Sequence, residues 1–252
     1  MFKRIVLLLA ILSIGTGFLS GCKSSTDITN GVSPTDLISL LTKKAEAIAK
    51  MPGWLHVTEN IVYDIDKENT GVLPNGTVVP LEQISETWYH VNEQGKVYQY
   101  VNTSTTTDGQ TIQVSVFLDN VILNLTTNIV VAMNPYSLGA LDYRFSSEMQ
   151  DYMTRTGKTP AVRITDVDGR QTAIFTIEET LNSPTTTENY TEPVYGLRTV
   201  AYFDMDTGLL FRLERYRIFK DGSERTFYRT DITVEPDATP PQDILDYMKR
   251  IN

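Results

Sequence analysis

Alternation of apolar and polar residues with a period of two governs most of this chain and constrains its fold more than any other feature. It begins in the stretch WLHVTENIVYDID, where Leu55, Val57 and Ile61 share one side and His56 and Thr58 share the other. This period is that of a β-strand with one buried face. The 13 tyrosines of the chain also favour strands. The sequence therefore predicts a mainly β protein from residue 54 onwards.

Short turn signals divide the alternating region into strands. Further alternating runs cover residues 86–91, 96–104, 111–118, 121–130, 161–180 and 197–235. The signals between or within these runs are Glu93-Gln94-Gly95, Asp108-Gly109, Asp119-Asn120, Asp168-Gly169, Asp206-Thr207-Gly208 and Asp221-Gly222. Glycine after Asp or Asn is typical of the tight turns that join antiparallel neighbours. We therefore expect one antiparallel, strongly curved sheet over residues 54–234.

Three segments have helical rather than strand character. The stretch SPTDLISLLTKKAEAIAKM places Leu37, Leu41, Ala45 and Ile48 at helical spacing. It predicts a helix over about residues 35–50, capped by Ser33 or Thr35 and ended by Pro52-Gly53.

A polar helical stretch is expected near residues 146–156, and a short amphipathic helix holding Ile244, Leu245 and Met248 closes the chain. The first two helices are expected to cover the sheet. Residues 181–196, LNSPTTTENYTEPVYG, have no internal period and predict a long polar loop.

The amino-terminal segment has the layout of a secretory signal peptide. Lys3 and Arg4 precede an apolar run from Ile5 to Leu12, which is too short to span a bilayer. The segment ends in LSGC, whose Cys22 is the only cysteine, and this ending resembles the lipobox of bacterial lipoproteins. The resemblance implies removal of residues 1–21 and a diacylglyceryl group on Cys22, which would anchor the chain to a membrane. A buried apolar cysteine or a free thiol are the alternatives.

The expected organisation is a signal peptide at 1–21, a lipidated cysteine with a flexible tether at 22–34, and a folded domain at 35–252. The lipobox implies an extracytoplasmic location, on the outer face of the cytoplasmic membrane or at the outer membrane. Removal of residues 1–21 takes away Lys3 and Arg4 and no acid, so 20 basic against 31 acidic residues leave a charge of −11. Such a body is expected to repel nucleic acid and anionic headgroups.

The sequence lacks the combinations of residues that most enzyme active sites need. The chain has two histidines, His56 and His90, without metal-spaced partners, and a structural role on a strand face is the simpler reading of both. No nucleophile elbow or phosphate-binding glycine loop occurs. The acidic stretches DIDKEN and DMDTG place carboxylates two residues apart, as calcium loops do, but Asp-rich hairpin turns explain them more simply. We therefore expect no enzyme activity, no cofactor and no metal.

Three stretches carry a resemblance to a known superfamily. LLTKKAEAIAKMPGWLHVTE is similar to the opening helix and first strand of the LolA/LolB lipoprotein carriers, which share their fold with LppX/LprG-type lipoproteins and with the amino-terminal domains of RseB/MucB-type sensors. AYFDMDTGLLFRLERYRIFKDGSERTFYRTDITVEP is similar to their late turn and hairpin, and TPPQDILDYM to their closing segment. The resemblance implies an α+β fold in which an incomplete, strongly curved antiparallel β-barrel with a helical cover encloses an apolar cavity for acyl chains.

The apolar pattern supplies candidates for the lining of such a cavity. They are Leu37, Leu41, Ile48, Leu55, Val57, Ile61, Trp88, Val114, Val116, Phe175, Ile177, Phe211 and Leu213. Each suits a lipid cavity and an ordinary core equally, because a bent sheet under a helix either fills its interior with side chains or leaves room for a guest.

Two classes of function follow from these observations. A carrier or receptor would hold the acyl chains of a lipid or lipoprotein without a covalent step. A sensor of the RseB/MucB type would use the same fold to bind a protein partner. An enzyme is the third and least supported class, and nucleic acid is not an expected partner.

Overall fold

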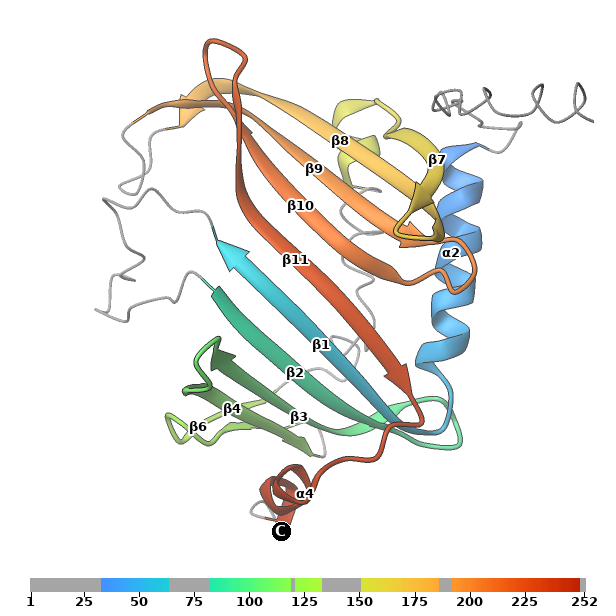
Figure 1. The fold of residues 1–252 in the computed structure, drawn as a ribbon, viewed down its shortest axis with the longest axis vertical. Coiled ribbons are helices and arrows are strands. Elements are labelled where there is room, and N and C mark those ends of the chain that lie inside the picture. Colours follow the sequence, from blue (N-terminus) through green and yellow to red (C-terminus); the bar gives the residue numbers. More distant parts are fainter. Residues whose placement is uncertain (1–32, 64–81, 119–120, 133–150, 186–191, 250–252) are drawn as a thin grey trace, which may run out of the picture.

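The computed structural model describes residues 33–63, 82–118, 121–132, 151–185 and 192–249. One eleven-stranded sheet dominates these residues, with α2 (Pro34–Ala49) and α4 (Gln242–Lys249) beside it (Figure 1). The strands are β1 (Gly53–Tyr63), β2 (Glu82–Val91), β3 (Val97–Thr106), β4 (Thr111–Leu118), β5 (Val121–Asn124), β6 (Ile129–Ala132), β7 (Ala161–Val167), β8 (Arg170–Thr185), β9 (Val194–Asp204), β10 (Leu210–Ile218) and β11 (Glu224–Pro236). Residues 151–156 are also helical.

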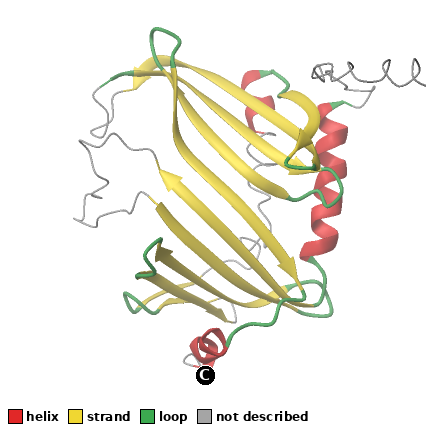
Figure 2. Ribbon diagram, in the orientation of Figure 1, coloured by secondary structure: helices red, strands yellow, loops and turns green. Residues whose placement is uncertain are grey.

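The sheet consists of two meanders joined at one long-range pair. Its order is β6-β5-β4-β3-β2-β1-β11-β10-β9-β8-β7, so only β1 and β11 are neighbours that lie far apart in sequence. Every pair is antiparallel, and the sheet ends at β6 and β7 without closing. Figure 2 shows the resulting curved, open layer of strands. The predicted mainly β fold, an incomplete curved barrel with helices beside it, is confirmed.

The predicted opening helix is confirmed as α2, and its ends have local causes. Ser33 is the N-cap, and its Oγ accepts a hydrogen bond from the Asp36 backbone N–H at 3.1 Å. Pro34 occupies the first turn, where a missing N–H costs nothing. Leu37, Ile38 and Leu41 are buried, so one stripe of the helix packs against the sheet.

The turn between β9 and β10 holds α2 in place. Asp204 Oδ1 accepts hydrogen bonds from the N–H groups of Asp206 and Thr207, which makes DMDTG a hairpin turn rather than a cation loop. Gly208 has a φ of +74°, and a Cβ there would lie 2.1 Å from the Leu41 carbonyl oxygen. The Lys44 ammonium donates to the Met205 carbonyl at 2.5 Å. Helix and turn thus meet backbone to backbone.

Strand pairing defines two faces of the sheet, because residues directly opposite each other point to the same side. We call the side that contacts α2 the α2 face; its apolar cluster includes Leu41, Phe175, Ile177, Phe203 and Leu213. A second cluster on this face joins Leu55 and Val57 to the end of the helix.

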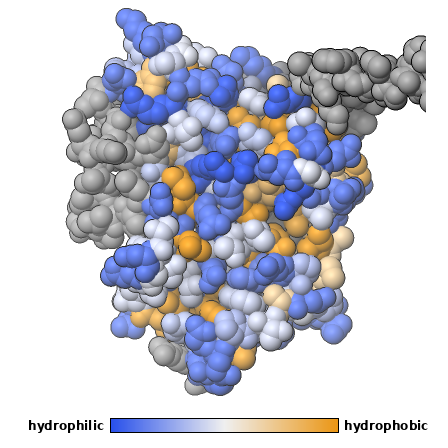
Figure 3. All heavy atoms as spheres, viewed as in Figure 1, coloured by the Kyte–Doolittle hydropathy of each residue, from blue (hydrophilic) through white to orange (hydrophobic). Residues whose placement is uncertain are grey.

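We call the opposite side the α4 face. There Ile244 and Met248 of α4 pack against Trp88, Val101 and Val116. The predicted closing helix is confirmed, and two of its three apolar residues are buried while Leu245 is half-buried. In Figure 3 hydrophilic residues cover most of the visible surface, and hydrophobic residues form scattered patches.

One predicted strand is wrong. The run 121–130 is split into β5 and β6 because the side-chain oxygen of Asn124 accepts hydrogen bonds from the N–H groups of Thr126 and Thr127. Asn128 then adopts a φ of +55°, which reverses the chain. The sequence NLTTN is therefore a hairpin turn.

The predicted loop at 181–196 is also shorter than expected. Strand β8 continues to Thr185 and β9 begins at Val194, where Thr185 and Val194 pair. Several sequence predictions lie outside the described residues: the signal peptide, Cys22 and most of its tether, the DIDKEN stretch, the turn at 119–120 and the first part of the helix at 146–156.

We expect Gly208→Ala to destabilise the fold more than Gly222→Ala. Both glycines have positive φ, but a Cβ on Gly222 meets nothing within 4 Å, so that substitution costs about 1–2 kcal/mol of backbone strain alone. Overpacking against Leu41 should add about 1–3 kcal/mol. Urea unfolding of residues 24–252 measures both losses, and equal losses would contradict the close contact between turn and helix.

Candidate functional site

The α2 face brings together nine of the thirteen predicted lining residues. Leu37, Leu41 and Ile48 reach it from α2, and Leu55, Val57, Ile61, Phe175, Ile177 and Leu213 reach it from the strands. All except half-buried Ile48 are buried. Eight of the nine belong to the two apolar clusters and pack within them. An ordinary hydrophobic core accounts for the burial of these side chains. Their contact with an acyl chain stays a prediction.

The other four candidates lie on the α4 face. Trp88, Val114 and Val116 belong to the cluster beneath α4. Phe211 sits at a register shift between Leu210 and Arg212, where it contacts the Tyr202 ring at 6.2 Å and the Arg170 guanidinium at 5.3 Å. The sequence expectation of one shared inward face is therefore wrong for these four residues.

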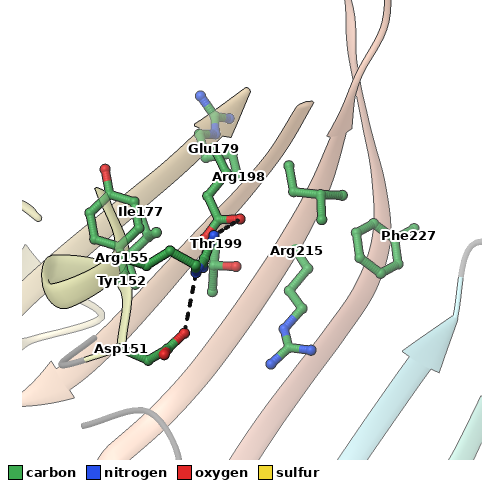
Figure 4. Close-up of a pocket in the computed structure, with 10 residues that line it drawn as sticks. Asp151, Tyr152, Arg155, Ile177, Glu179, Arg198, Thr199, Arg215 and Phe227 are labelled. Atoms are coloured by element: carbon green, nitrogen blue, oxygen red, sulfur yellow. Dashed lines mark hydrogen bonds and ion pairs between the residues drawn. The ribbon is translucent and has the colours of Figure 1, made fainter. Parts of the chain in front are cut away.

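A hollow of about 210 Å³ opens on the α2 face where β8–β11 pass the helical residues 151–156 (Figure 4). Ile177, Thr199 and Arg215 are successive cross-strand neighbours in its wall. Its full lining is Asp151, Tyr152, Arg155, Ile177, Glu179, Leu197, Arg198, Thr199, Arg215 and Phe227. This volume lies below the roughly 300–1,000 Å³ of pockets for drug-sized ligands. We call it the Arg155–Arg215 pocket.

The pocket is continuous with the apolar cluster beneath α2. Tyr152 is 5% exposed and Ile177 is 6% exposed, and both belong to that cluster as well as to the lining. The Tyr152 hydroxyl donates to the Glu178 carbonyl at 3.3 Å, which fixes the ring on the sheet. The pocket therefore has an apolar inner wall.

Charged groups form the outer wall of the pocket. The Arg155 Nη1 donates to Glu179 Oε2 at 3.2 Å, its Nη2 donates to Glu179 Oε1, and its Nε donates to Asp151 Oδ2 at 3.4 Å. The hydrogen bonds that Arg155 donates to Glu179, together with the negative charge of that carboxylate, raise the pKa of the Arg155 guanidinium. Arg155 is therefore a fixed cation at every physiological pH.

A second guanidinium approaches from the strands. The Arg215 guanidinium carbon lies 5.7 Å from the centre of the Tyr228 ring, and that of Arg217 lies 4.4 Å from the Phe227 ring. Arg217 follows Arg215 on the same face of β10 and is only 8% exposed. Both contacts are cation–π contacts that orient the arginines on the α2 face.

Sequence reasoning missed a group of polar residues on the same face. Asn102 Nδ2 donates to Ser85 Oγ at 3.0 Å and to Thr87 Oγ1 at 2.8 Å, and Gln113 Nε2 donates to Ser115 Oγ at 2.9 Å. Ser85, Thr87 and Ser115 are buried. The alternation of Ser, Thr and Asn in SETWYH and VNTSTT was the available signal, since it places polar residues on the face opposite Trp88 and Val101.

The two histidines stack on the two tryptophans of the chain. The ring centres of Trp54 and His90 lie 4.2 Å apart, and those of His56 and Trp88 lie 4.0 Å apart. These are directly opposed pairs on β1 and β2. The structural role expected for both histidines agrees with this packing.

No group of three or more His, Cys, Asp or Glu side chains in the described part of the chain is arranged to hold a metal ion. None of the helices in these same segments is long and apolar enough to cross a membrane.

The sequence matches no known family model and no curated protein. The fold is similar to that of lipoprotein LppX from Mycobacterium tuberculosis, with 10% identity over 82% of this chain and 99% of that chain and a TM-score of 0.39. It is also similar to LprF from Mycobacterium bovis, with 12% identity over 83% of this chain and 96% of that chain and a TM-score of 0.35. A β-barrel-like protein of a domain of unknown function from Brucella abortus gives 11% identity, 74% and 99% coverage and a TM-score of 0.23. At these identities the likenesses concern the fold alone.

We expect a pH dependence of stability that comes from His90. Burial lowers the pKa of His90 from its ordinary value of about 6.5, against the opposing hydrogen bond to Gln99. The folded state then binds fewer protons than the unfolded state, so stability is full above about pH 6.5 and falls as the pH drops through the folded pKa. Urea titrations at several pH values should show a steeper fall for the parent chain than for His90→Gln, and parallel curves would contradict this expectation.

Proposed function

We propose that this protein is a membrane-anchored, extracytoplasmic lipoprotein that binds acyl chains of lipids or lipoproteins on the α2 face of its sheet. The observation that carries the proposal is the sharing of Tyr152 and Ile177 between the Arg155–Arg215 pocket and the apolar cluster beneath α2. An acyl chain entering at the pocket would meet apolar side chains without crossing the sheet.

Binding of this kind needs no covalent step. Each buried methylene contributes about 0.8 kcal/mol, so affinity would grow with chain length. The pocket volume of about 210 Å³ is small for a long chain, so the helical cover must move to admit it. Helix α2 covers the apolar cluster that adjoins the pocket, so outward movement of α2 is the expected opening.

Filling the pocket should block acyl binding. Thr199 is half-buried in the pocket wall, and Thr176 is half-buried on the opposite face of the adjacent strand, so Thr199→Trp and Thr176→Trp form a matched pair. We expect Thr199→Trp to weaken binding of a fluorescent fatty acid about tenfold, or roughly 1.4 kcal/mol, and Thr176→Trp to leave it unchanged.

Fluorescence titration of both variants and the parent chain measures this difference. Circular dichroism verifies that each variant keeps the strand-dominated fold. Equal affinities of the two variants would place the acyl chain elsewhere, and no uptake by the parent chain would refute the carrier proposal.

The anchor is the second part of the proposal. Lys3, Arg4, the apolar run and the LSGC ending support export and lipid attachment at Cys22. We expect Cys22→Ser to be released from membranes by a high-salt wash that leaves the parent chain bound, because a lipid chain is held by hydrophobic burial and not by charge. Retention of the variant in the membrane fraction would refute the anchor.

A protein-binding sensor is a second candidate function, favoured by one edge of the sheet. In β6, Ile129 is 56% exposed and Val130 is 62% exposed. An exposed apolar edge strand can pair with an extended segment of another chain. Stable capture of a protein partner that is lost in Val130→Lys, with no acyl binding by the parent chain, would favour the sensor.

A further inference from the structure

We propose that the Arg155–Arg215 pocket binds the compact anionic headgroup of the acyl lipid, a carboxylate or a phosphate. This inference rests on the acyl-binding function proposed above and adds the chemical class of the ligand. Its basis is the placement of arginines from two separate elements around a small hollow that leads into apolar side chains.

Arginines from two separate elements line the pocket. Arg155 comes from the helical residues 151–156, and Arg215 comes from β10 across the pocket (Figure 4). The guanidinium of Arg217, next along that face of β10, lies over Phe227, which is itself part of the lining. Guanidinium groups match the planar oxygens of carboxylate and phosphate with two parallel hydrogen bonds.

The charge of the pocket is opposite to that of the chain. The formal net charge of the whole chain is −9, and the charge of −11 expected after removal of residues 1–21 predicted repulsion of anionic headgroups. The lining of the pocket, however, holds three arginines, Arg155, Arg198 and Arg215, beside two acids, Asp151 and Glu179. Field lines concentrate in a hollow with low-dielectric walls, so an anion is favoured inside it even though the exterior is acidic.

Arg155 keeps donors for a ligand while it is held in place. A guanidinium has five N–H donors. Within the described part of the chain, the hydrogen bonds of Arg155 to Glu179 and Asp151 use three of them, one from each nitrogen. Two N–H donors remain on a group whose position is already fixed, so ligand binding need not first order the side chain.

The size of the hollow and its apolar wall set the kind of ligand. About 210 Å³ is too little for a bulky headgroup and suits a carboxylate or a phosphate. Along β8, Glu179 lies on the outer wall, followed inward by Ile177 and Phe175 of the apolar cluster. The headgroup would therefore lie at Arg155 and Arg215, and the hydrocarbon would point toward α2.

The test uses three fluorescent probes that share one alkyl chain and end in a carboxylate, a phosphate monoester or a neutral alcohol. For the purified full chain we expect the two anionic probes to bind at least about tenfold more tightly than the alcohol, or roughly 1.4 kcal/mol. In Arg155→Gln and Arg215→Gln this preference should disappear while binding of the alcohol persists. The matched control is Arg163→Gln, which removes the same charge from an exposed position on the α4 face of β7.

Each outcome separates the inference from the function on which it rests. Equal binding of the three probes by the parent chain overturns the headgroup site and leaves acyl binding intact. Loss of the preference in Arg163→Gln as well overturns the pocket as its cause. Binding of inorganic phosphate alone, with no uptake of any probe, overturns a lipid as the source of the anion, and no uptake of any ligand refutes acyl binding itself. Thermal unfolding of Arg155→Gln, whose side chain is 54% exposed, verifies that the variant is folded.

Discussion

The pairing of β1 with β11 is the constraint on which the rest of the structure depends. It joins Leu55 to Pro236 at one end and Tyr63 to Tyr228 at the other, across most of the chain length. Without it the molecule would be two separate meanders, each with an uncovered apolar face. Helix α2 precedes β1 in sequence but packs on the β8–β10 side of this pair, so the pairing also delivers the helical cover. Such distant contacts close a large loop, which predicts slow folding.

Much of the fold could be predicted from the sequence because its signals are local. Strand β4 and the turn at Asp168-Gly169 follow from alternation and turn chemistry within a few residues. The helix α2 follows from its periodicity and from Ser33. The split of the run at 121–130 also had a local signal, since Asn124 and Asn128 are turn formers, but the alternation around them concealed it.

The sequence could not predict on which face of the sheet each apolar residue lies. Alternation separates the residues into two faces, but it does not say which helix covers each face. Val114 and Val116 look as suitable for the α2 face as Phe175 and Ile177 do, yet they lie beneath α4. Phe211 lies on the α4 face because the register shift between Leu210 and Arg212 breaks the period of two. The Arg155–Arg215 pocket was equally hidden, since Arg155 and Arg215 line one hollow only through the tertiary placement of residues 151–156.

The energetics of the helical cover limit which acyl chains the proposed site can hold. Lifting α2 exposes Leu37, Ile38 and Leu41, at about 1.5–3 kcal/mol for each fully buried side chain, or about 5–9 kcal/mol together. At about 0.8 kcal/mol per methylene, a guest needs roughly 6–11 buried methylenes to offset that loss. Short chains cannot displace the helix, whereas the chains of membrane lipids can. A headgroup held at Arg155 and Arg215 would add to the affinity for the lipid at a point that α2 does not cover. In this proposal the helix sets a minimum length for the acyl chain, and the pocket sets the charge of the headgroup.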